Sequence, residues 1–587
     1  MYLNILKLKR YKKKENIFLF TKKLLIKRDL FMYSNIDELK DKFLRMWATF
    51  SPYNAFRNGL REYGGFFAIE TPEWIANYKY FLASFQKTLT QVDFDVLSEK
   101  DKIEFLLLDN KIRSDLFSVF DLDVFHSDPI HYLNVAFIFE YLLKNYAPLD
   151  QRIHELALHF NYFPAYFKQA LLNLNRDKLS PELVEMAHLM TTGMLSFLNN
   201  LDSELKTLSK DSNEIISELT FKLVLENNIE AIKSLNEYDN FLKDTLPKSK
   251  ASFRLGKDNY LKMLQSNERV ENITIEKLLE ACEKNLNRNV DEFKKAAKNV
   301  NPNMTVDQIS ERIRKNHPTK ESLIKDTTQI LSEVKEYCRN MVDVPSEVMP
   351  KVMPTPNPER PWAFAAMNSP GPLETIATDS YYYITPPEDD WPEDQQQEWL
   401  ETFNYKGLKD ISVHECFPGH YLHHLHNQRS PYIMSKLFGA YHFWEGYALH
   451  VEEEMWQIGF QKGDYEYRMA QLMETLLRNV RMIVSIKLHT TDDFTVEDGI
   501  QLFMKYAYLG RKPAEAEAKR GTFDPGYLNY CLGKLMIEKL KDDYKAEKGE
   551  NFDNKEFYNT LLSFGAPPIP IVRKFMLKNK SIHSEIL

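Results

Sequence analysis

The sequence predicts a mainly α-helical fold with a small β element beside the candidate site. Apolar residues recur at three- and four-residue intervals over long stretches, and helix-capping residues precede several of these stretches. Two short segments, 362–367 and 381–385, instead favour strands because they are rich in aromatic residues and flanked by turn-forming residues. With 43% apolar residues in a chain of 587, the protein can bury a sizeable core.

Charge and cysteine usage exclude several classes of protein. The net charge is −8, and residues 1–31 hold ten Lys/Arg against two acids, so the remainder is near −16 (−8 minus +8). An acidic body argues against nucleic-acid binding, because phosphate contacts require Lys and Arg. The four cysteines form no paired motif, which predicts neither disulfides nor a Cys-type zinc site and favours a cytoplasmic location.

Residues 1–31 form a basic leader with two short apolar runs, 17–20 and 24–26, that lysines interrupt. Neither run is long enough for a signal-peptide core or a membrane span. The leader is either a mis-assigned extension, with Met32 as the true start, or a loose surface-binding tail. Elsewhere there is no uninterrupted apolar window of 18 residues, so we expect no stable membrane insertion.

Residues 32–344 are predicted to form an N-terminal helical region. Helical periodicity is clear in three stretches: 103–117, 153–174 and 215–225. The predicted N-caps are Ser180, Thr274 and Thr305, the last with Gln308 in a capping box. Little in this region points to chemistry, so we interpret it as a scaffold or one wall of a cleft.

A change in composition near residue 345 separates this region from a predicted catalytic region, 345–587. Eleven of the 27 prolines fall in its Pro-rich first segment, 345–392. The two predicted strands lie here, and a strand with free backbone groups can hold an extended peptide by β-addition. Tyr382 and Tyr383 are therefore candidate substrate-binding residues, although the segment could equally be an aromatic-rich loop.

The segment His414-Glu415-Cys416-Phe417-Pro418-Gly419-His420, followed 25 residues later by Glu445, predicts a metal centre. Two neutral imidazoles and one carboxylate fill three tetrahedral positions of zinc and leave the fourth for water. Glu415 then lies where it can accept that water's proton. We expect one Zn²⁺ per chain, held by His414, His420 and Glu445; Glu452 and Glu453 on the same helix compete with Glu445.

The histidine spacing predicts an irregular backbone at this site. His414 and His420 are separated by six residues, which places them about 240° apart on a regular helix. Pro418 has no N–H to donate to the carbonyl of His414, and Gly419 permits backbone conformations that other residues resist. A break with a bulged turn is therefore expected, and it would bring the two imidazoles together.

Two more segments carry candidate residues. The stretches 444–458 and 469–488 are predicted helices, the first with Glu445 and the second with Arg478, ending at His489. Arg478 would bind a substrate carboxylate or pair with a nearby acid. The turn that begins at Asp524 leads into a helix with two phenols, Tyr527 and Tyr530.

Together these motifs resemble the bacterial and archaeal family called domain of unknown function 885 (DUF885). The resemblance rests on H-E-x-x-P-G-H from His414, E-G-Y-A-L-H-V-E from Glu445, the R-x-x-R helix from Arg478, and P-G-Y-L-N-Y-C-L-G-K from Pro525. The family is similar to gluzincin-type zinc metallopeptidases, including all-helical enzymes with a deep substrate channel. This implies a helical channel architecture, the metal ligands His414, His420 and Glu445, and Glu415 as the base.

Two departures from the family pattern concern the histidine-rich helix. His423 replaces the usual glutamine, and Tyr421 follows the second ligand. They open a rival ligand set, His420 with His424 at i+4, which would leave Glu415 without an evident task.

These features predict a zinc-dependent hydrolase that cleaves peptide bonds of small or extended peptides with Glu415 as general base. By resemblance, the oxyanion donor would be Tyr530, Tyr527 or His489, in falling order of preference. The alternatives are a zinc hydrolase of a non-peptide amide or ester, and a non-catalytic helical binding protein with a vestigial metal site. The expected partner is a peptide substrate, and a homodimer is allowed.

Overall fold

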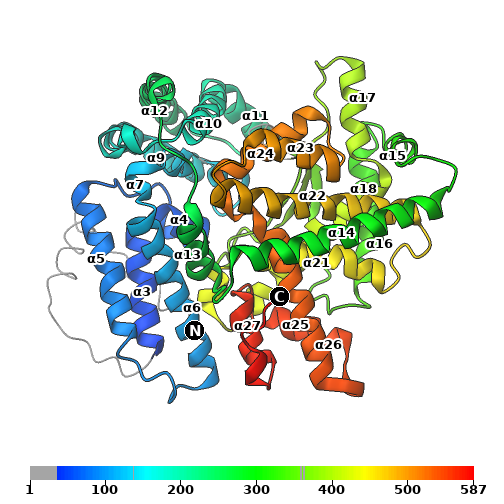
Figure 1. Cartoon of the computed structure of the whole chain (residues 1–587). Coiled ribbons are helices and arrows are strands. Elements are labelled where there is room, and N and C mark those ends of the chain that lie inside the picture. The colour runs from blue at the N-terminus through cyan, green and yellow to red at the C-terminus, as the bar shows by residue number, and fades with distance from the viewer. Residues whose placement is uncertain (1–35, 137, 357–359, 361–363) are drawn as a thin grey trace.

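The structure, a computed structural model, describes residues 36–136, 138–356, 360 and 364–587. The basic leader lies outside these residues. Helices dominate the described part of the chain, and the strands found there form one small sheet (Figure 1), so the predicted fold class is confirmed.

The helices before the sheet form two consecutive groups along the chain, within residues 36–245 and 256–338. The first group consists of α3 (Ile36–Phe50), α4 (Pro52–Arg57), α5 (Pro72–Leu89), α6 (Glu99–Leu116), α7 (Val124–Ser127), α8 (Phe139–Leu143), α9 (Leu149–Asn173), α10 (Pro181–Asn199), α11 (Leu201–Ser212) and α12 (Glu218–Thr245). The second consists of α13 (Gly256–Glu268), α14 (Ile275–Val300), α15 (Val306–Arg314) and α16 (Leu323–Cys338).

The helices after the sheet carry the candidate site. They are α17 (Glu393–Thr402), α18 (Tyr405–Glu415), α19 (His420–Arg429), α20 (Ile433–Leu437), α21 (Tyr441–Gln457), α22 (Tyr465–Thr490), α23 (Val496–Tyr506), α24 (Arg511–Phe523), α25 (Asn529–Lys548), α26 (Asn554–Ser563) and α27 (Ile569–Met576). The short 3-10 turn η6 (Pro525–Leu528) precedes α25.

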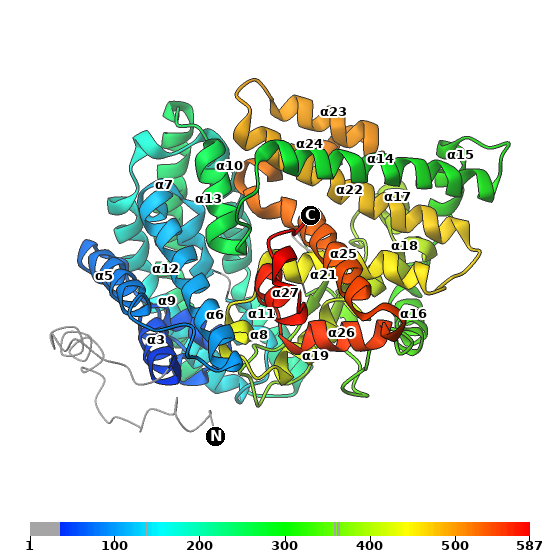
Figure 2. The same ribbon diagram turned by 60° about the horizontal axis from the view of Figure 1, so that its bottom comes forward.

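Two large apolar clusters hold these helices together. One lies among α9, α10 and α12, which occupy the upper left of Figure 1. The other runs from Ile36 in α3 to Ile586 near the C-terminus and includes residues of α14, α21, α22 and α25. In Figure 2, α14 lies beside α22 and α21 beside α25, and both pairs are in contact. The division of the chain at residue 344 remains a prediction.

The small sheet contains β1 (Lys351–Pro354), β2 (Ala365–Asn368) and β3 (Tyr381–Ile384) in the order β1-β3-β2. β1 is parallel to β3 and β2 is antiparallel to it. β2 is therefore an edge strand, and it contacts α18. The predicted strand at 381–385 is confirmed, and the one at 362–367 is shifted toward residue 368, with 362–363 outside the described residues.

Capping accounts for several helix starts. Ser180, Thr274 and Thr305 each accept a hydrogen bond from the backbone N–H three residues later, and Gln308 completes the capping box, as predicted. The predicted helical stretch 215–225 is confirmed from Glu218 onward. The helix begins after the cap Ser217, and Ile215 is exposed, because the cap rather than the apolar pattern determines the start.

Among the described residues, no helix combines the length and apolar character needed to cross a bilayer.

Helices α21 and α25 approach each other closely at two glycines. A Cβ on Gly446 would lie 2.4 Å from the Gly533 Cα, and a Cβ on Gly533 would lie 1.9 Å from the carbonyl oxygen of His442. Real Cβ atoms do not approach backbone this closely, so the helices can pack in this register only with glycine at both positions.

We expect Gly446→Ala to lower the free energy of unfolding by about 1–3 kcal/mol or more, because the methyl group meets backbone that cannot move aside. Thermal or denaturant unfolding measures this change. Gly510→Ala is the control, since its Cβ would find its nearest neighbour at 3.8 Å. Equal stability of the two variants would contradict the proposed close packing.

Candidate metal centre

The predicted break in the helix is present between α18 and α19. α18 ends at Glu415 and α19 begins at His420. The N–H of Gly419 donates to the Val413 carbonyl (3.0 Å), six residues back rather than four. A Cβ on Gly419 would lie 1.7 Å from the carbonyl oxygen of His414, so only glycine fits this turn.

This turn brings the two imidazoles of the motif together. The ring centroids of His414 and His420 are 4.8 Å apart, and the rings are perpendicular. Atoms of His414, Glu415 and His420 that could bind a metal all lie within 4.8 Å of one another. The histidines thus share one site although they are six residues apart.

Glu445 on α21 completes a three-ligand arrangement. Its Oε2 lies 3.6 Å from His414 Nε2 and 3.4 Å from His420 Nε2. Two atoms bound to one tetrahedral zinc at 2.0–2.1 Å are about 3.3 Å apart. The distances from Glu445 to both imidazoles are close to this value, and two imidazoles with one carboxylate are donors that zinc prefers, so the residues fit the ion.

Glu452 binds the other side of the His414 ring. Its Oε1 is 2.6 Å from His414 Nδ1, and its Oε2 has no hydrogen-bond partner among the described residues. An acceptor at Nδ1 fixes the proton there and leaves Nε2 free to bind a metal. Glu452, predicted as a competitor for the ligand position, is therefore placed to orient a ligand.

A second buried carboxylate lies behind this pair. Asp410 precedes His414 by about one helical turn and accepts a hydrogen bond from the Tyr467 hydroxyl (3.3 Å). Burial and the charge of Glu452 raise the pKa of Asp410 well above its usual range. Its i, i+4 spacing to His414 is the sequence signal that could have identified it.

The candidate ligand residues shift one another's pKa values. Burial by itself would raise the pKa of Glu445, but the imidazoles of His420 and His414 hold it well below its usual range. Burial would lower the pKa of His414, whereas its contacts with Glu445 and Glu452 raise it to about 10. Without a metal, the site therefore attracts protons to His414.

The carboxylate of Glu415 contacts the small sheet. Its Oε2 accepts a hydrogen bond from the backbone N–H of Met367 in β2 (2.9 Å). The carboxylate next to the metal ligands is thus fixed to the edge strand. The role of Met367 was missed from sequence because a backbone N–H has no side-chain signature.

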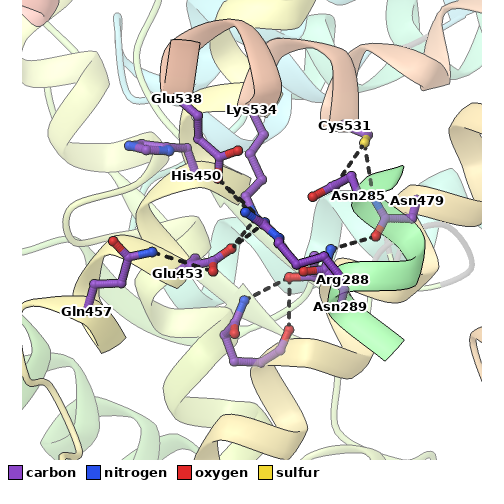
Figure 3. A network of polar contacts seen from close by, with 12 residues as sticks. Asn285, Arg288, Asn289, His450, Glu453, Gln457, Asn479, Cys531, Lys534 and Glu538 are labelled. Atoms are coloured by element: carbon purple, nitrogen blue, oxygen red, sulfur yellow. Dashed lines mark hydrogen bonds and ion pairs between the residues drawn. The ribbon is translucent and has the colours of Figure 1, made fainter. Parts of the chain in front are cut away.

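Neighbouring glutamates hold α21 in place, as Figure 3 shows for Glu453. Glu453 forms ion pairs with the fully buried Lys534 of α25, with Arg288 of α14 (3.4 Å) and with Arg468 of α22 (3.4 Å). The next residue, Glu454, binds Lys541 of α25 (2.6 Å). Glu453 therefore anchors the helix and does not face the histidines.

The rival ligand set receives no support from the contacts of the histidines after His420. His424 Nε2 is buried without a hydrogen-bond partner among the described residues, and burial lowers the pKa of His424 to about 4. His423 Nε2 contacts the Gly565 carbonyl (2.9 Å), and its ring packs on Trp444. Neither imidazole is paired with Glu445.

Tyr530 lies in a cluster of guanidinium groups. Its ring is within 5.2–6.0 Å of the guanidinium carbons of Arg478, Arg481 and Arg520, and 5.8 Å from the ring of Tyr441, one turn before Glu445. Each arginine is also paired with an acid: Arg478 with Glu474, Arg481 with Glu517, and Arg520 with Asp524. Arg478 thus pairs with a nearby acid, which is one of its two predicted roles. Its other predicted role, binding a substrate carboxylate, stays a prediction.

The other two candidate oxyanion donors are packed elsewhere. Both ring nitrogens of His489 contact backbone, with Nε2 2.8 Å from the Gly521 carbonyl and Nδ1 accepting from the N–H of Leu255 (3.4 Å). Tyr527 is fully buried, its hydroxyl is close to Gly521, and it packs in a small cluster with residues of α22–α24. The structure does not bring these side chains to the ligand set.

The two candidate substrate-binding tyrosines are also buried. Tyr382 is fully buried, and its hydroxyl is 3.3 Å from that of Ser412 in α18. Tyr383 is only 3% exposed, and its ring stacks with the ring of Tyr381. Both belong to the central strand β3, so their placement suits support of the sheet rather than contact with a substrate.

Comparisons with known proteins agree with the family resemblance. The family described as "Bacterial protein of unknown function (DUF885)" matches residues 52–576. No curated protein matches significantly. A solved structure from Shewanella oneidensis, described as a "putative lipoprotein of unknown function", has a TM-score of 0.78 at 22% identity and covers 93% of this chain and 100% of its own. A second solved structure, described as a "putative lipoprotein" from Colwellia psychrerythraea, has a TM-score of 0.77 at 15% identity. The match covers 93% of this chain and 99% of the other. At these identities, the two structures support the fold alone.

Replacing the orienting carboxylate should weaken metal binding. We expect Glu452→Gln to lower zinc affinity about 10- to 100-fold, because the amide lacks the charge that holds the His414 proton. A chelator-competition titration measures the affinity. Glu466→Gln is the control, since Glu466 pairs with Arg312 near the surface. Unchanged affinity in Glu452→Gln would contradict its orienting role.

Zinc affinity should also increase with pH. The raised pKa of His414, about 10, keeps its imidazole protonated in the metal-free protein, whereas ligation requires the neutral form. Because raising the pH removes the competing proton, affinity should rise about tenfold per pH unit between roughly pH 6 and 9. Titrations across this range test the slope, and a flat profile above about pH 7 would show that His414 is already neutral.

Proposed function

The chain belongs to the DUF885 family, and we propose that it is a zinc-dependent hydrolase that cleaves peptide bonds, related to gluzincin metallopeptidases. The observation that carries this proposal is the convergence of His414 Nε2 and His420 Nε2 on one oxygen of Glu445, at 3.6 and 3.4 Å. A carboxylate that could act as a base, Glu415, lies beside these ligands.

His414, His420 and Glu445 would hold the ion, and this ligand set favours zinc over harder metals. When bound, zinc supplies Lewis acidity, which polarises a carbonyl group and makes water more acidic. Three protein ligands leave a position open for water or substrate, as catalytic zinc sites require. Glu452 keeps the proton of His414 on Nδ1, away from the ion.

Glu415 is the proposed general base. It would accept a proton from the attacking water as the new C–O bond forms, and return that proton to the leaving amine as the amide C–N bond then breaks. The hydrogen bond from Met367 to Oε2 fixes the carboxylate and leaves Oε1 to exchange the proton. The same hydrogen bond holds the Glu415 carboxylate beside the edge strand.

The geometry of β2 favours a peptide over other amides or esters. The N–H of Met367 points away from β3, and the Phe364 carbonyl accepts from the Thr385 N–H of the strand next to it. Because alternate residues of an antiparallel strand face the partner strand, Ala365 presents both backbone groups to the free edge. Met367 presents its carbonyl there, since its N–H is bound to Glu415. An extended peptide can pair with these groups by β-addition.

Tyr530 remains the leading candidate for the oxyanion donor. It is partly exposed and lies beside Tyr441, one turn before Glu445. Tyr527 and His489 are weaker candidates, because the first is fully buried and the second uses both ring nitrogens for backbone contacts.

The cellular location and oligomeric state remain predictions. Four free, buried cysteines suit a reducing cytoplasm. The description of both solved relatives as lipoproteins points to a different location. A homodimer is still allowed.

The first test is metal content by elemental analysis. We expect about one zinc per wild-type chain, at most a trace in His420→Ala, and full content in His426→Ala, the control. His426 lies on the same helix, but its Nε2 contacts the Asp343 carbonyl (2.9 Å). If zinc-supplied wild type binds no metal, the hydrolase proposal fails; metal retained in His420→Ala would exclude His420 as a ligand.

Glu415→Gln then separates binding from catalysis. This variant should keep its zinc but hydrolyse a peptide library about 10²- to 10⁴-fold more slowly, because it has no general base. Peptide hydrolysis at the wild-type rate would show that Glu415 is not the base.

A further inference from the structure

A polar cleft lies at the end of the edge strand, apart from the metal ligands. Its volume is about 320 Å³, and it is bounded by α4, α8 and the segment that follows β2. Its lining includes Asn54, Arg57, Asn58, Glu140 and Ser369.

The walls of the cleft are held together by backbone contacts. The N–H of Leu373 donates to the Asn58 carbonyl (3.0 Å), and a Cβ on Gly371 would lie 2.5 Å from the carbonyl oxygen of Arg57. Lys144, which is 3% exposed, binds the side chain of Asn368 and the carbonyl of Ser369 (3.2 Å). The segment leaving β2 is therefore fixed, so the cleft is preformed.

One wall of the cleft follows directly, along the chain, after the strand that holds Glu415. Met367, whose N–H binds Glu415, is two residues before Ser369 and four before Gly371. At about 3.3–3.4 Å per extended residue, the cleft lies roughly 7–14 Å along the chain from the Glu415 contact. A peptide paired with β2 and cut beside Glu415 would place its end in the cleft about two to four residues from the cut.

Glu140 gives the cleft an incompletely neutralised carboxylate. Its contacts with the Arg61 guanidinium are long, 3.4 and 3.5 Å. Arg61 is bound more closely by Glu374, with its Nε 2.5 Å from the Glu374 Oε2. The hydroxyl oxygen of Ser369 is also buried without a hydrogen-bond partner among the described residues. A carboxylate and carboxamides are groups that bind an ammonium ion.

The direction of the strand decides which end of a peptide would reach the cleft. β2 runs toward the cleft, so a peptide added antiparallel to it would run away from the cleft and place its amino terminus there. Antiparallel pairs are more stable per residue and more frequent than parallel ones. We propose that the cleft binds the free amino terminus of a peptide substrate, with Glu140 accepting hydrogen bonds from the ammonium group.

This inference rests on the proposed function and narrows its substrate class. The protein would remove short amino-terminal fragments, about two to four residues long, from peptides whose amino group is free. Blocking that group would remove both its charge and two of its donors, and would leave Glu140 facing an amide.

The test measures binding with Glu415→Gln holoprotein, in which the proposed hydrolysis is slowed about 10²- to 10⁴-fold. The probes are penta-alanine peptides with a fluorescent lysine amide at the carboxyl end, either with a free amino terminus or acetylated. We expect the free-amine peptide to bind about tenfold more tightly, as for a charge-assisted hydrogen bond. Adding Glu140→Gln should remove this preference, whereas Glu62→Gln, an equal charge change on an exposed neighbour outside the cleft, should preserve it.

Three results would overturn the inference: no binding of the free-amine peptide, no preference for it over the acetylated peptide, or a preference that persists in Glu140→Gln. A parallel peptide is tested with an acetylated probe ending in a free carboxylate. If this probe binds best and Arg57→Gln abolishes the advantage, the cleft binds the other end of the peptide. The comparison between probes in one protein does not depend on the folding of any cleft variant.

The two proposals fail differently. If Glu415-containing protein with zinc hydrolyses no peptide, the proposed function fails. If it hydrolyses free and acetylated peptides equally well, the hydrolase proposal stands and the amino-terminal cleft is excluded.

Discussion

The contact between Gly419 and the carbonyl of His414 is the constraint on which the candidate site depends. There is no room for a Cβ at this position, since it would lie 1.7 Å from that oxygen. The missing side chain lets the backbone turn back, so His420 lies against His414 instead of pointing to another side of the helix. A new helix, α19, begins at His420 directly after the break. The backbone of this helix therefore holds the second imidazole in position.

The position of Glu445, the third candidate ligand, depends on a helix that is anchored by buried charges. Glu452, Glu453 and Glu454 are consecutive, and successive helical residues point about 100° apart. One therefore meets His414, the second meets Lys534 and two arginines, and the third meets Lys541. Buried charges are costly unless they are paired, so these contacts restrict α21 to one position and rotation. Glu445, two turns before Glu452, is positioned by the same restriction.

The carboxylate of Glu415 joins the helical part of the candidate site to the sheet. Because Glu415 binds the backbone of β2, the proposed base contacts the strand that leads into the segment lining the polar cleft. Lys144 from the N-terminal helices fixes that segment at Asn368 and Ser369. Residues before and after the sheet therefore both contribute to the surroundings of the edge strand.

The sequence by itself determined the features that depend on neighbouring residues: the helical class, the caps at Ser180 and Thr305, and the break that Pro418 and Gly419 impose. It also predicted His414, His420 and Glu445 as the candidate metal ligands. Only the tertiary structure decided which of three consecutive glutamates faces His414, and it placed His489, Tyr527 and Tyr382 in packed surroundings. The physical reason is that capping and backbone strain act within one or two turns, whereas the role of a carboxylate, imidazole or phenol depends on partners that are distant in the chain.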